Sequence, residues 1–334
     1  MTLISKARRT NPHGWRINTV SKSTDLIPLA NTEKQERIAD IIFIHGLGGD
    51  ALDTWRHPKN KQDRNNYWPL WLVKDFPQMG IWSLAYEVEP TKWKGSTMPL
   101  VERADNSLDL LEIKGIGKRP IFFITHSMGG LLVKQMLRNA DDSVNDAWQQ
   151  ILNNTRGIVY LATPNSGSNI ASFLKFIGAD ILTSVSVKEL EAHHPQLLKL
   201  NRVHRDKEIF NQIPIKVYGE NKPIKPIGIV VDKTSVDPGR AGVTPIILDR
   251  DHISICKPES TDDRLYLGVK QFIEAHIEDN SQSSESFSLA LIFLDKPRQS
   301  SPRCLAFRHF SFQASNQFSN YIGLGSIRQQ TILV

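Results

Sequence analysis

Residues 119–134, RPIFFITHSMGGLLVK, constrain the fold of this chain more than any other stretch. The apolar run 121–124 predicts a buried strand, and residues 131–137 place apolar side chains at helical spacing. A serine in a sharp turn between a strand and a helix is typical of a nucleophile elbow, which lifts the hydroxyl above the edge of a sheet. The sequence therefore predicts Ser127 as a nucleophile. The N–H of Met128 is the predicted donor to a developing oxyanion.

The motif departs from its usual form, Gly-x-Ser-x-Gly, at one position. Thr125 stands in the place of the first glycine, where strand and helix come close together. A serine in a turn before an ordinary helix is the alternative interpretation. We favour the nucleophile because strand and helix both lie where the motif requires them.

A glycine-rich loop follows a second predicted strand. Residues 41–44 are β-branched or aromatic, as in a central parallel strand, and HGLGG follows at 45–49. In serine hydrolases of the α/β type this loop supplies half of the oxyanion hole, and we assign that role to the N–H of Leu47. HGLGG fits neither the Walker pattern nor G-x-G-x-x-G, which excludes a nucleotide site of those kinds. The predicted supports of the loop are His45, Gly46 and Gly48.

Strand-like and helix-like segments alternate along the chain. Apolar runs at 81–86 and 156–162 predict further strands, and residues 99–113 have the apolar spacing of a helix. Residues 14–20 alternate like an edge strand. The alternation predicts an α/β fold with a mostly parallel, doubly wound sheet.

Composition limits the classes of function. A chain of 334 residues with 40% hydrophobic content can bury a large core. Its two cysteines, Cys256 and Cys304, cannot build a disulfide framework or a cysteine metal cluster, so we expect a reducing compartment, no metal and no cofactor.

The net charge of +6 favours mild attraction to anionic surfaces such as phospholipid head groups. No basic run or zinc-finger spacing is present, so no nucleic acid partner is expected. Residues 1–24 are basic, and we interpret them as a solvated leader rather than a signal or transit peptide. No apolar window approaches the roughly 20 residues of a membrane span. We expect an intracellular protein, cytoplasmic or peripherally associated with membranes.

Several separated motifs carry a resemblance to a known family: HGLGGDALDTW, YWPLWLVKDFP, ITHSMGGLLVKQML, GIVYLATPNSGS and DHISICKP. Together they resemble the serine-active-site-containing protein family, lipase-like proteins of the α/β-hydrolase fold. The resemblance covers about residues 38–276 and implies lipids or other acyl esters as the substrate class. Asn165 stands where the family often has histidine, which we expect to change only a turn.

A serine nucleophile needs a base, which in this fold follows the serine and an acid along the chain. His252 is best placed, because it follows the predicted last strand, 246–248, and precedes a predicted terminal helix, 263–278. The resemblance places the base here too. The other histidines after the serine suit exposed helix faces: His193, His194, His204, His276 and His309.

The acid that orients the base is less sharply defined. The carboxylate normally lies just beyond the penultimate strand, predicted at 215–218, and Glu220 fits directly. Asp232 is the alternative, with Asp237 behind it. Asp251 is a poor partner, because neighbouring side chains in an extended loop point apart.

The sequence divides into three segments. Residues 1–37 are the predicted N-terminal leader and edge strand, and 38–279 the α/β-hydrolase domain. Within that domain, 169–213 take the position of a helical cap, which would accept acyl chains or else pack on its own domain. Residues 280–334 are serine-rich and predict a weakly ordered tail.

Two hypotheses of function follow. The first is a serine hydrolase that cleaves carboxylic esters, of lipids or small molecules, through an acyl-enzyme; transfer to an alcohol would use the same residues. The second is a catalytically weak module of the same fold that binds protein partners or serves signalling, which the Thr125 departure motivates.

Overall fold

The computed structural model describes residues 24–46, 48–58, 67–86, 100–165, 187–225 and 227–277. All of them lie in the first of two compact units, Met1–Glu285. The predicted edge strand at 14–20 and the predicted tail lie outside the described residues.

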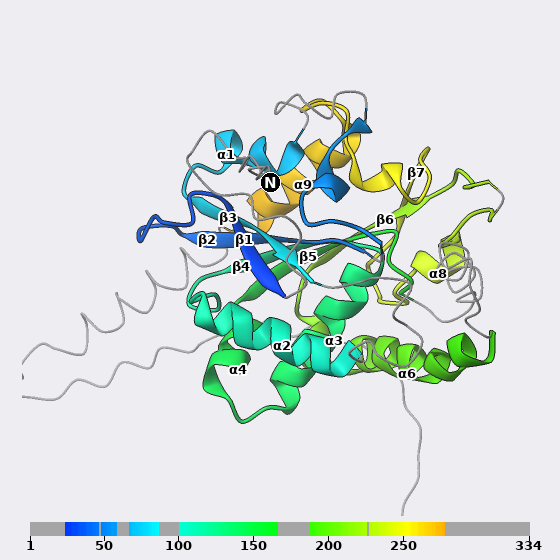
Figure 1. The fold of residues 1–334 in the computed structure, drawn as a ribbon, viewed down its shortest axis with the longest axis horizontal. Coiled ribbons are helices and arrows are strands. Elements are labelled where there is room, and N and C mark those ends of the chain that lie inside the picture. Colours follow the sequence, from blue (N-terminus) through cyan, green and yellow to red (C-terminus); the bar gives the residue numbers. More distant parts are fainter. Residues whose placement is uncertain are drawn as a thin grey trace, which may run out of the picture. The chain divides into compact units, whose positions relative to one another are not determined.

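The centre of this unit is a sheet with the strand order β1-β3-β2-β4-β5-β6-β7 (Figure 1). β1 pairs antiparallel with β3, and every other neighbouring pair is parallel. The carboxyl ends of the parallel strands therefore meet at one edge, where α/β proteins build their sites. The strands are β1 (Asp25–Ala30), β2 (Ala39–Ile44), β3 (Met79–Ala85), β4 (Ile121–His126), β5 (Thr155–Leu161), β6 (Ile215–Glu220) and β7 (Ile246–Leu248).

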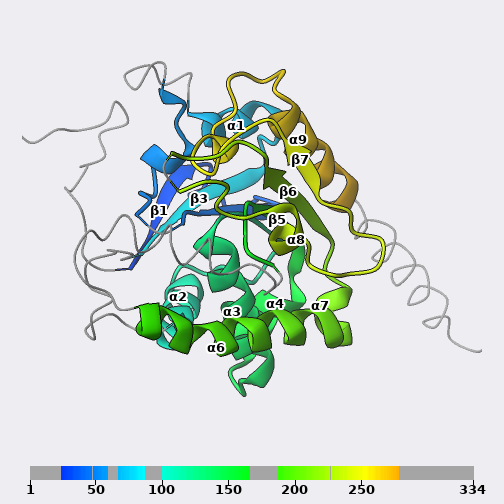
Figure 2. The ribbon, with the colours of Figure 1, turned by 90° about the vertical axis from the view of Figure 1, so that its right-hand side faces the viewer.

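Helices cover both faces of the sheet (Figure 2). One face carries α1 (Leu72–Asp75) and α9 (Arg264–Ile277); the other carries α2 (Leu100–Ile113), α3 (Met128–Asp142), α4 (Asp146–Asn153) and α6 (Val187–Asp206). Two one-turn helices complete the described set, α7 (Glu208–Asn211) and α8 (Lys233–Val236).

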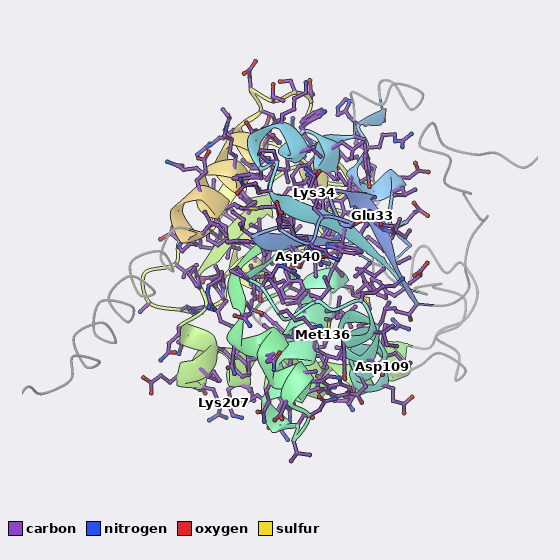
Figure 3. All side chains as sticks on the ribbon, turned by 90° about the vertical axis from the view of Figure 1, so that its left-hand side faces the viewer. Glu33, Lys34, Asp40, Asp109, Met136 and Lys207 are labelled. Carbon is purple, nitrogen blue, oxygen red and sulfur yellow. The ribbon has the colours of Figure 1, made fainter. Side chains whose placement is uncertain are left out.

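A buried polar cluster joins the start of β2 to β3. Asp40 is fully buried, and its Oδ1 accepts hydrogen bonds from Arg37 Nε at 2.7 Å and Trp82 Nε1 at 2.8 Å. Figure 3 labels Asp40 and, for comparison, Lys207, whose side chain is 47% exposed. The carboxylate thus fixes the N-terminal end of the central strands, opposite the edge that carries the site.

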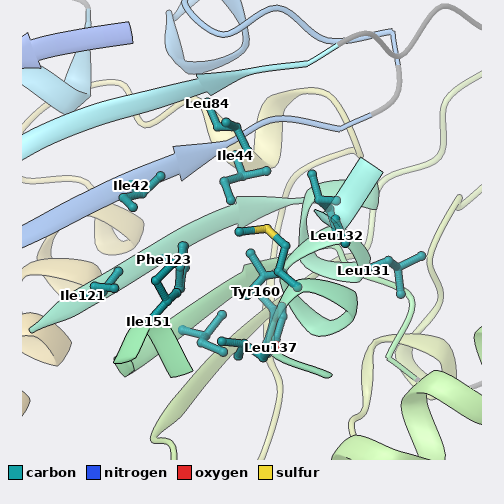
Figure 4. Packing of buried hydrophobic residues seen from close by; sticks show 14 of the residues in the cluster. Ile42, Ile44, Leu84, Ile121, Phe123, Leu131, Leu132, Leu137, Ile151 and Tyr160 are labelled. Atoms are coloured by element: carbon teal, nitrogen blue, oxygen red, sulfur yellow. The ribbon is translucent and has the colours of Figure 1, made fainter. Parts of the chain in front are cut away.

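The core lies on both sides of the sheet because β2 and β4 are buried on both faces. Ile42, Ile44 and Phe123 pack with α2 and α3 (Figure 4). Ile41 and Phe43 belong to the opposite cluster, with residues of α1 and α9. Continuous apolar runs therefore form central strands here, as the sequence predicts.

One strand was not expected from the sequence. β1 (Asp25–Ala30) lies within the segment interpreted as leader and edge strand, but it contains Pro28 and does not alternate. An edge strand tolerates proline, since one side of its backbone makes no ladder bonds. β1 accordingly lies at the end of the sheet, against β3 alone.

Part of the predicted cap is described. Phe210 of α7 is buried in the same cluster as residues of α3, and Leu197 and Val203 of α6 pack against that cluster. Asn201 of α6 also receives a hydrogen bond from Lys134 of α3. This end of α6 therefore packs on its own domain, whereas residues 166–186 lie outside the described part of the chain.

The prediction of fold class is confirmed. A mostly parallel sheet with one antiparallel edge strand, helices on both faces and a serine in the turn after a central strand make up the α/β-hydrolase fold.

Candidate active site

Ser127 lies in the turn between β4 and α3, with φ of +53° and ψ of −123°. Residues other than glycine rarely adopt a positive φ, so the backbone of this turn is strained. Contacts with the surrounding structure must hold it in place. The N–H of Ser127 donates to Leu161 O at 2.9 Å, and the hydroxyl of Thr163 donates to Ser127 O at 3.1 Å. Hydrogen bonds with the end of β5 and the loop after it therefore hold the strained turn at both the N–H and the carbonyl of Ser127.

Two glycines allow this turn to pack closely against the loop after β2. A Cβ on Gly46 would lie 2.8 Å from the Cβ of Ser127, and a Cβ on Gly129 would collide with the carbonyl oxygen of Ile44. Real Cβ atoms do not approach other atoms this closely. The serine can therefore lie against the end of β2 only because both positions lack a side chain.

Thr125, the departure from the usual motif, is accommodated within β4. It is fully buried, and its Oγ1 donates a hydrogen bond to Val159 O of β5 at 2.9 Å. Its polar group is therefore satisfied by the neighbouring strand.

The structure brings His252 to Ser127. His252 lies in the loop after β7, and its Nε2 is 2.9 Å from Ser127 Oγ. Both residues are 1% exposed. If Nε2 is unprotonated, it accepts the hydroxyl proton, which is the arrangement that general-base activation of a serine requires.

Glu220, the last residue of β6, lies on the other side of the imidazole. Its Oε2 is 3.0 Å from His252 Nδ1, and its Oε1 accepts the backbone N–H groups of Val230 at 2.7 Å and Val231 at 2.6 Å. A proton on Nδ1 that donates to the carboxylate leaves Nε2 free to accept from Ser127. The three side chains thus form one continuous line of hydrogen bonds.

A second histidine, which the sequence analysis did not single out, holds the backbone of His252. Nε2 of His126 lies 2.8 Å from the carbonyl oxygen of His252, and the two rings are 5.0 Å apart. Burial lowers the pKa of His126 well below its usual value, and the nearby His252 adds to the effect. The ring is therefore neutral and donates from Nε2. Its position in the motif, directly before the serine, was the available signal.

The loop after β2 is held by its histidine. His45 Nδ1 lies 2.8 Å from Gly46 O, the His45 ring stacks on Tyr86 at 4.5 Å, and the Tyr86 hydroxyl donates to His45 O at 2.5 Å. Burial lowers the pKa of His45 to about 4, so the ring is neutral near pH 7. Gly48 follows, exposed, with φ of +64°, and Leu47 lies outside the described residues.

Met128 is the first residue of α3 and is buried. The first N–H groups of a helix have no partner within it. The N–H of Met128 therefore belongs to the positive end of α3, directly after Ser127.

The other carboxylates considered for the acid role bind elsewhere. Asp232 Oδ1 accepts the N–H groups of Thr234 and Ser235 as the N-cap of α8. Asp237 accepts from the N–H of Gly239, and Asp251 from that of Ser254.

The remaining histidines lie on helices or outside the described side chains. The expectation of an exposed position is wrong for His204, which is 8% exposed because it packs against α3 and contacts Lys134 O; His276 contacts Phe272 O. The side chains of His193, His194 and His309 are not among those described.

Asn165, where the resembled family often has histidine, is buried beyond β5. Its Nδ2 donates to Val236 O at 2.8 Å, at the end of α8. It therefore links the loop after β5 to the segment that follows the two amides bound by Glu220.

Within the described residues, no group of three or more His, Cys, Asp or Glu side chains could hold a metal ion. No helix in the same part of the chain is long and apolar enough to cross a membrane.

Among curated proteins, the chain is similar to those named SERAC1. It is 34% identical to SERAC1 of Homo sapiens over 256 residues, which cover 70% of this chain and 38% of the human protein. It is 32% identical to SERAC1 of Danio rerio over 258 residues, which cover 71% of this chain and 39% of that protein. The chain thus spans well under half the length of these relatives. The resemblance to serine-active-site-containing proteins is confirmed.

No protein-family model matches the chain. A carboxylesterase structure from Nitrososphaera gargenis has a TM-score of 0.48 and 13% identity, covering 82% of this chain and 100% of that one. Esterase B of Lactobacillus Rhamnosis has a TM-score of 0.43 and 13% identity, covering 80% of this chain and 90% of that one. Because these TM-scores are below 0.5, the α/β-hydrolase fold is assigned from the strand order of the sheet and from the turn that carries Ser127.

Proposed function

We propose that the chain is a serine hydrolase that cleaves carboxylic esters through an acyl-enzyme intermediate. The observation that carries the proposal is the line of hydrogen bonds from Ser127 Oγ to His252 Nε2 at 2.9 Å and from His252 Nδ1 to Glu220 Oε2 at 3.0 Å. A nucleophile, a base and an orienting acid in this order are the parts that acyl transfer to a serine requires.

In the proposed reaction, Ser127 Oγ attacks the ester carbonyl carbon while its proton moves to Nε2 of His252. Glu220 stabilises the resulting imidazolium, which then gives its proton to the leaving alcohol as the tetrahedral intermediate collapses. Water, deprotonated by the same histidine, attacks the acyl-serine and releases the acid. Attack by an alcohol instead would transfer the acyl group through the same residues.

The oxyanion of the tetrahedral intermediate needs two donors. We assign the N–H of Met128, which lies at the start of α3, and the N–H of Leu47 in the loop that His45 holds. One such donor contributes about 10²–10³-fold to the rate. General-base catalysis by the histidine contributes about 10²–10⁴-fold.

We assign the acid role to Glu220 rather than Asp232. Two backbone amides hold one oxygen of Glu220 while the other faces the imidazole. Asp232 is engaged as a helix cap, with its Oδ1 on two N–H groups of α8. An orienting acid must be held rigidly, since the imidazole is positioned through it.

We propose lipids or other apolar acyl esters as the substrate class. The resemblance supports this class, and so do two exposed apolar side chains that neighbour site residues in the sequence. Ile253, directly after the base, is 53% exposed, and Ile229, directly before the amides that hold Glu220, is 36% exposed. Apolar side chains beside a polar reaction centre favour a substrate with an apolar acyl chain or contact with a lipid surface.

The intracellular location also remains a proposal. Among the described residues Cys256 is a free, buried thiol, and burial raises its pKa to about 11. A thiol of this kind is unreactive and compatible with a reducing compartment.

A fluorophosphonate probe tests the proposed nucleophile, because it labels only activated serines. The wild type should be labelled and should hydrolyse p-nitrophenyl esters, and Ser127→Ala should lose both activities. Ser107→Ala is the matched control: Ser107 is a fully buried serine whose hydroxyl donates to Arg103 O within α2. Its labelling should equal that of the wild type.

Two outcomes would contradict the proposal. Labelling that persists in Ser127→Ala would show that another residue reacts. A folded wild type that is neither labelled nor active would favour the alternative, a module of this fold that binds partners without turnover. A chain-length series of esters, run on the active wild type, then tests the substrate class.

A further inference from the structure

A second polar cluster lies beneath α6, away from Ser127. Lys134 of α3, about two helical turns after Ser127, is 3% exposed. Its Nζ donates to Asn201 Oδ1 of α6 at 2.7 Å, and Asn201 Nδ2 donates to Pro164 O at 3.1 Å. The lysine therefore joins α3 to α6 and to the end of β5.

This buried cation has no counter-charge in the described part of the chain. Its Nζ contacts a neutral amide oxygen of Asn201 and the ring of Tyr160, and the charge that acts on it is another cation, Arg240. Arg240 in turn donates to the backbone carbonyls of Ile213 and Asn211 rather than to a carboxylate. Lys134 is buried and Arg240 half-buried. A buried cation without an acid nearby is costly, because it loses its hydration.

The electrostatic consequence is visible at Lys134. Burial lowers the pKa of its ammonium to about 7, and the charge of Arg240 lowers it further. A negative guest beside the ammonium would offset both effects. The cluster thus favours an anion, or else the loss of the lysine's proton.

A cavity lies at this cluster, and its polar lining is rich in donors. Its free space is about 20 Å³, and its polar side chains are Lys134, Tyr160, Asn201, His204, Arg205 and Arg240. This is room for one guest of the size of a water molecule or a small ion. His204 Nε2 lies 2.6 Å from Lys134 O, and burial lowers the pKa of His204 to about 3, so this ring adds no charge.

Tyr160 provides the second observation. It is 2% exposed and lies within the core beside α3 (Figure 4). Tyr160 also lines the cavity. The ammonium of Lys134 lies over its ring, 5.3 Å from the ring centroid. The face of the ring carries partial negative charge but no formal charge, so it does not neutralise the lysine, and the hydroxyl of the same ring can donate to a guest in the cavity.

We propose that this cavity is a binding site for one small inorganic anion, of halide size or a compact oxyanion. The ammonium of Lys134, the hydroxyl of Tyr160 and the guanidinium of Arg240 supply its donors. These groups belong to α3, β5 and the segment after α8, and Lys134 also donates to Asn201 of α6. A bound anion that holds the ammonium in place therefore stabilises the packing of α6 on the domain. The anion site takes no part in the ester chemistry, so its test does not depend on the proposed function.

The test is thermal unfolding of the full chain in sodium bromide and in sodium gluconate of equal concentration. Bromide fits the cavity and gluconate is too large. Binding stabilises the native state, so ten times the dissociation constant of bromide should raise Tm by roughly 3–6 °C. General salt effects change Tm equally in all variants, so the measured quantity is the bromide-minus-gluconate shift of each variant relative to wild type.

Three variants locate the effect. Lys134→Met should abolish the bromide-specific shift. Tyr160→Phe, which removes one oxygen and keeps the ring in the core, should reduce the bromide affinity several-fold. Lys216→Met is the matched control: Lys216 is also partly buried beside a tyrosine ring, donates to Gly268 O and has a lowered pKa, but it does not line the cavity. Its shift should equal that of wild type.

The bromide-specific shift should be larger near pH 6 than near pH 8, because the anion binds the protonated ammonium. Of the groups at the cavity, Lys134 changes charge in this interval, because burial lowers its pKa to about 7, whereas His204 and Tyr160 stay neutral and Arg240 stays charged. A wild-type shift equal to that of Tyr160→Phe and Lys134→Met would overturn the proposal and assign a water molecule to the cavity. If Lys134→Met does not fold, Tyr160→Phe alone decides.

Discussion

Glu220 shares its carboxylate between the base and the backbone: Oε2 lies 3.0 Å from His252 Nδ1, and Oε1 accepts the amides of Val230 and Val231. The orientation of the imidazole therefore depends on the loop after β6 as well as on the acid itself. Because the acid is 1% exposed, water cannot replace a lost partner.

Replacement of Glu220 by glutamine should therefore lower kcat by about 10²–10⁴-fold, since a neutral amide neither holds the required tautomer nor stabilises the imidazolium. The variant should also lose about 1–3 kcal/mol of unfolding free energy, because one amide cannot satisfy all three donors. The measurements are ester hydrolysis and urea denaturation.

The control for this prediction is Asp232→Asn. Asparagine caps a helix as well as aspartate does, so stability and kcat should both stay near wild type. If Asp232→Asn lost activity and Glu220→Gln kept it, Asp232 would be the acid.

Much of the fold could be predicted because its strands are continuous apolar runs. β2 and β4 carry such runs and are buried on both faces, and the alternation with helices implied a parallel sheet. β1 could not be predicted, because an edge strand with Pro28 carries neither an apolar run nor alternation. Its place is decided by pairing with β3, which is a tertiary contact.

The candidate site was predictable only where a motif marks it. Ser127 is marked by its turn, whereas Glu220, Asp232 and Asp237 all follow apolar runs and look alike in sequence. In the structure they differ by their partners: Glu220 accepts the amides of Val230 and Val231, whereas Asp232 caps a helix. These contacts depend on the tertiary fold. The contacts of His126 with His252 are likewise set by the fold.

A side chain at Gly46 should disturb the nucleophile. In Gly46→Ala the new Cβ would lie 2.8 Å from Ser127 Cβ and 3.1 Å from His126 O, so the serine or the loop must shift. A displacement of about 1 Å at a reacting group costs on the order of 10²-fold in rate, and kcat/KM should fall by about that factor.

Gly115→Ala is the control for that steric effect. Gly115 has φ of +70° and no atom within 4 Å of an added Cβ. Alanine there strains the backbone by about 1–2 kcal/mol and should leave kcat/KM unchanged. An equal loss of activity in both variants would mean that general destabilisation, rather than the contact with Ser127, is responsible.

Acid should unfold the protein through its buried neutral histidines. The pKa of His45 is lowered to about 4 and that of His204 to about 3, and the pKa of His126 is also well below 6.5, in each case by burial. Because these folded pKa values lie below the unfolded value, the unfolded state binds more protons below pH 6.5. The stability that these histidines contribute is therefore full above about pH 6.5, and below it the unfolding free energy falls with pH by about 1.4 kcal/mol per unit for each histidine.

Urea denaturation at about pH 7.5, 6 and 5 measures this loss. His204→Gln, which can still donate to Lys134 O, should reduce the slope by one histidine's share, about 1.4 kcal/mol per pH unit. An unfolding free energy that stays constant between about pH 7.5 and 5 would contradict the prediction.

Asp40→Ala should destabilise the fold without changing the chemistry. The substitution leaves Arg37, whose side chain is 9% exposed, without its ion pair, and Trp82 Nε1 without an acceptor. Removal of one partner of a buried pair costs about 3–5 kcal/mol. Because Asp40 lies at the N-terminal end of β2, away from Gly46, kcat of the folded variant should equal that of wild type.

Lys207→Ala provides the comparison at the surface. Lys207 pairs with Asp141 at 2.6 Å, but its side chain is 47% exposed, so the loss should be at most about 1 kcal/mol. Urea denaturation of both variants near pH 7.5 gives the difference between a buried and an exposed pair. An equal loss of unfolding free energy in Asp40→Ala and Lys207→Ala would contradict the prediction. The packing of Trp82 on β2, and not the polar cluster around Asp40, would then hold that end of the sheet.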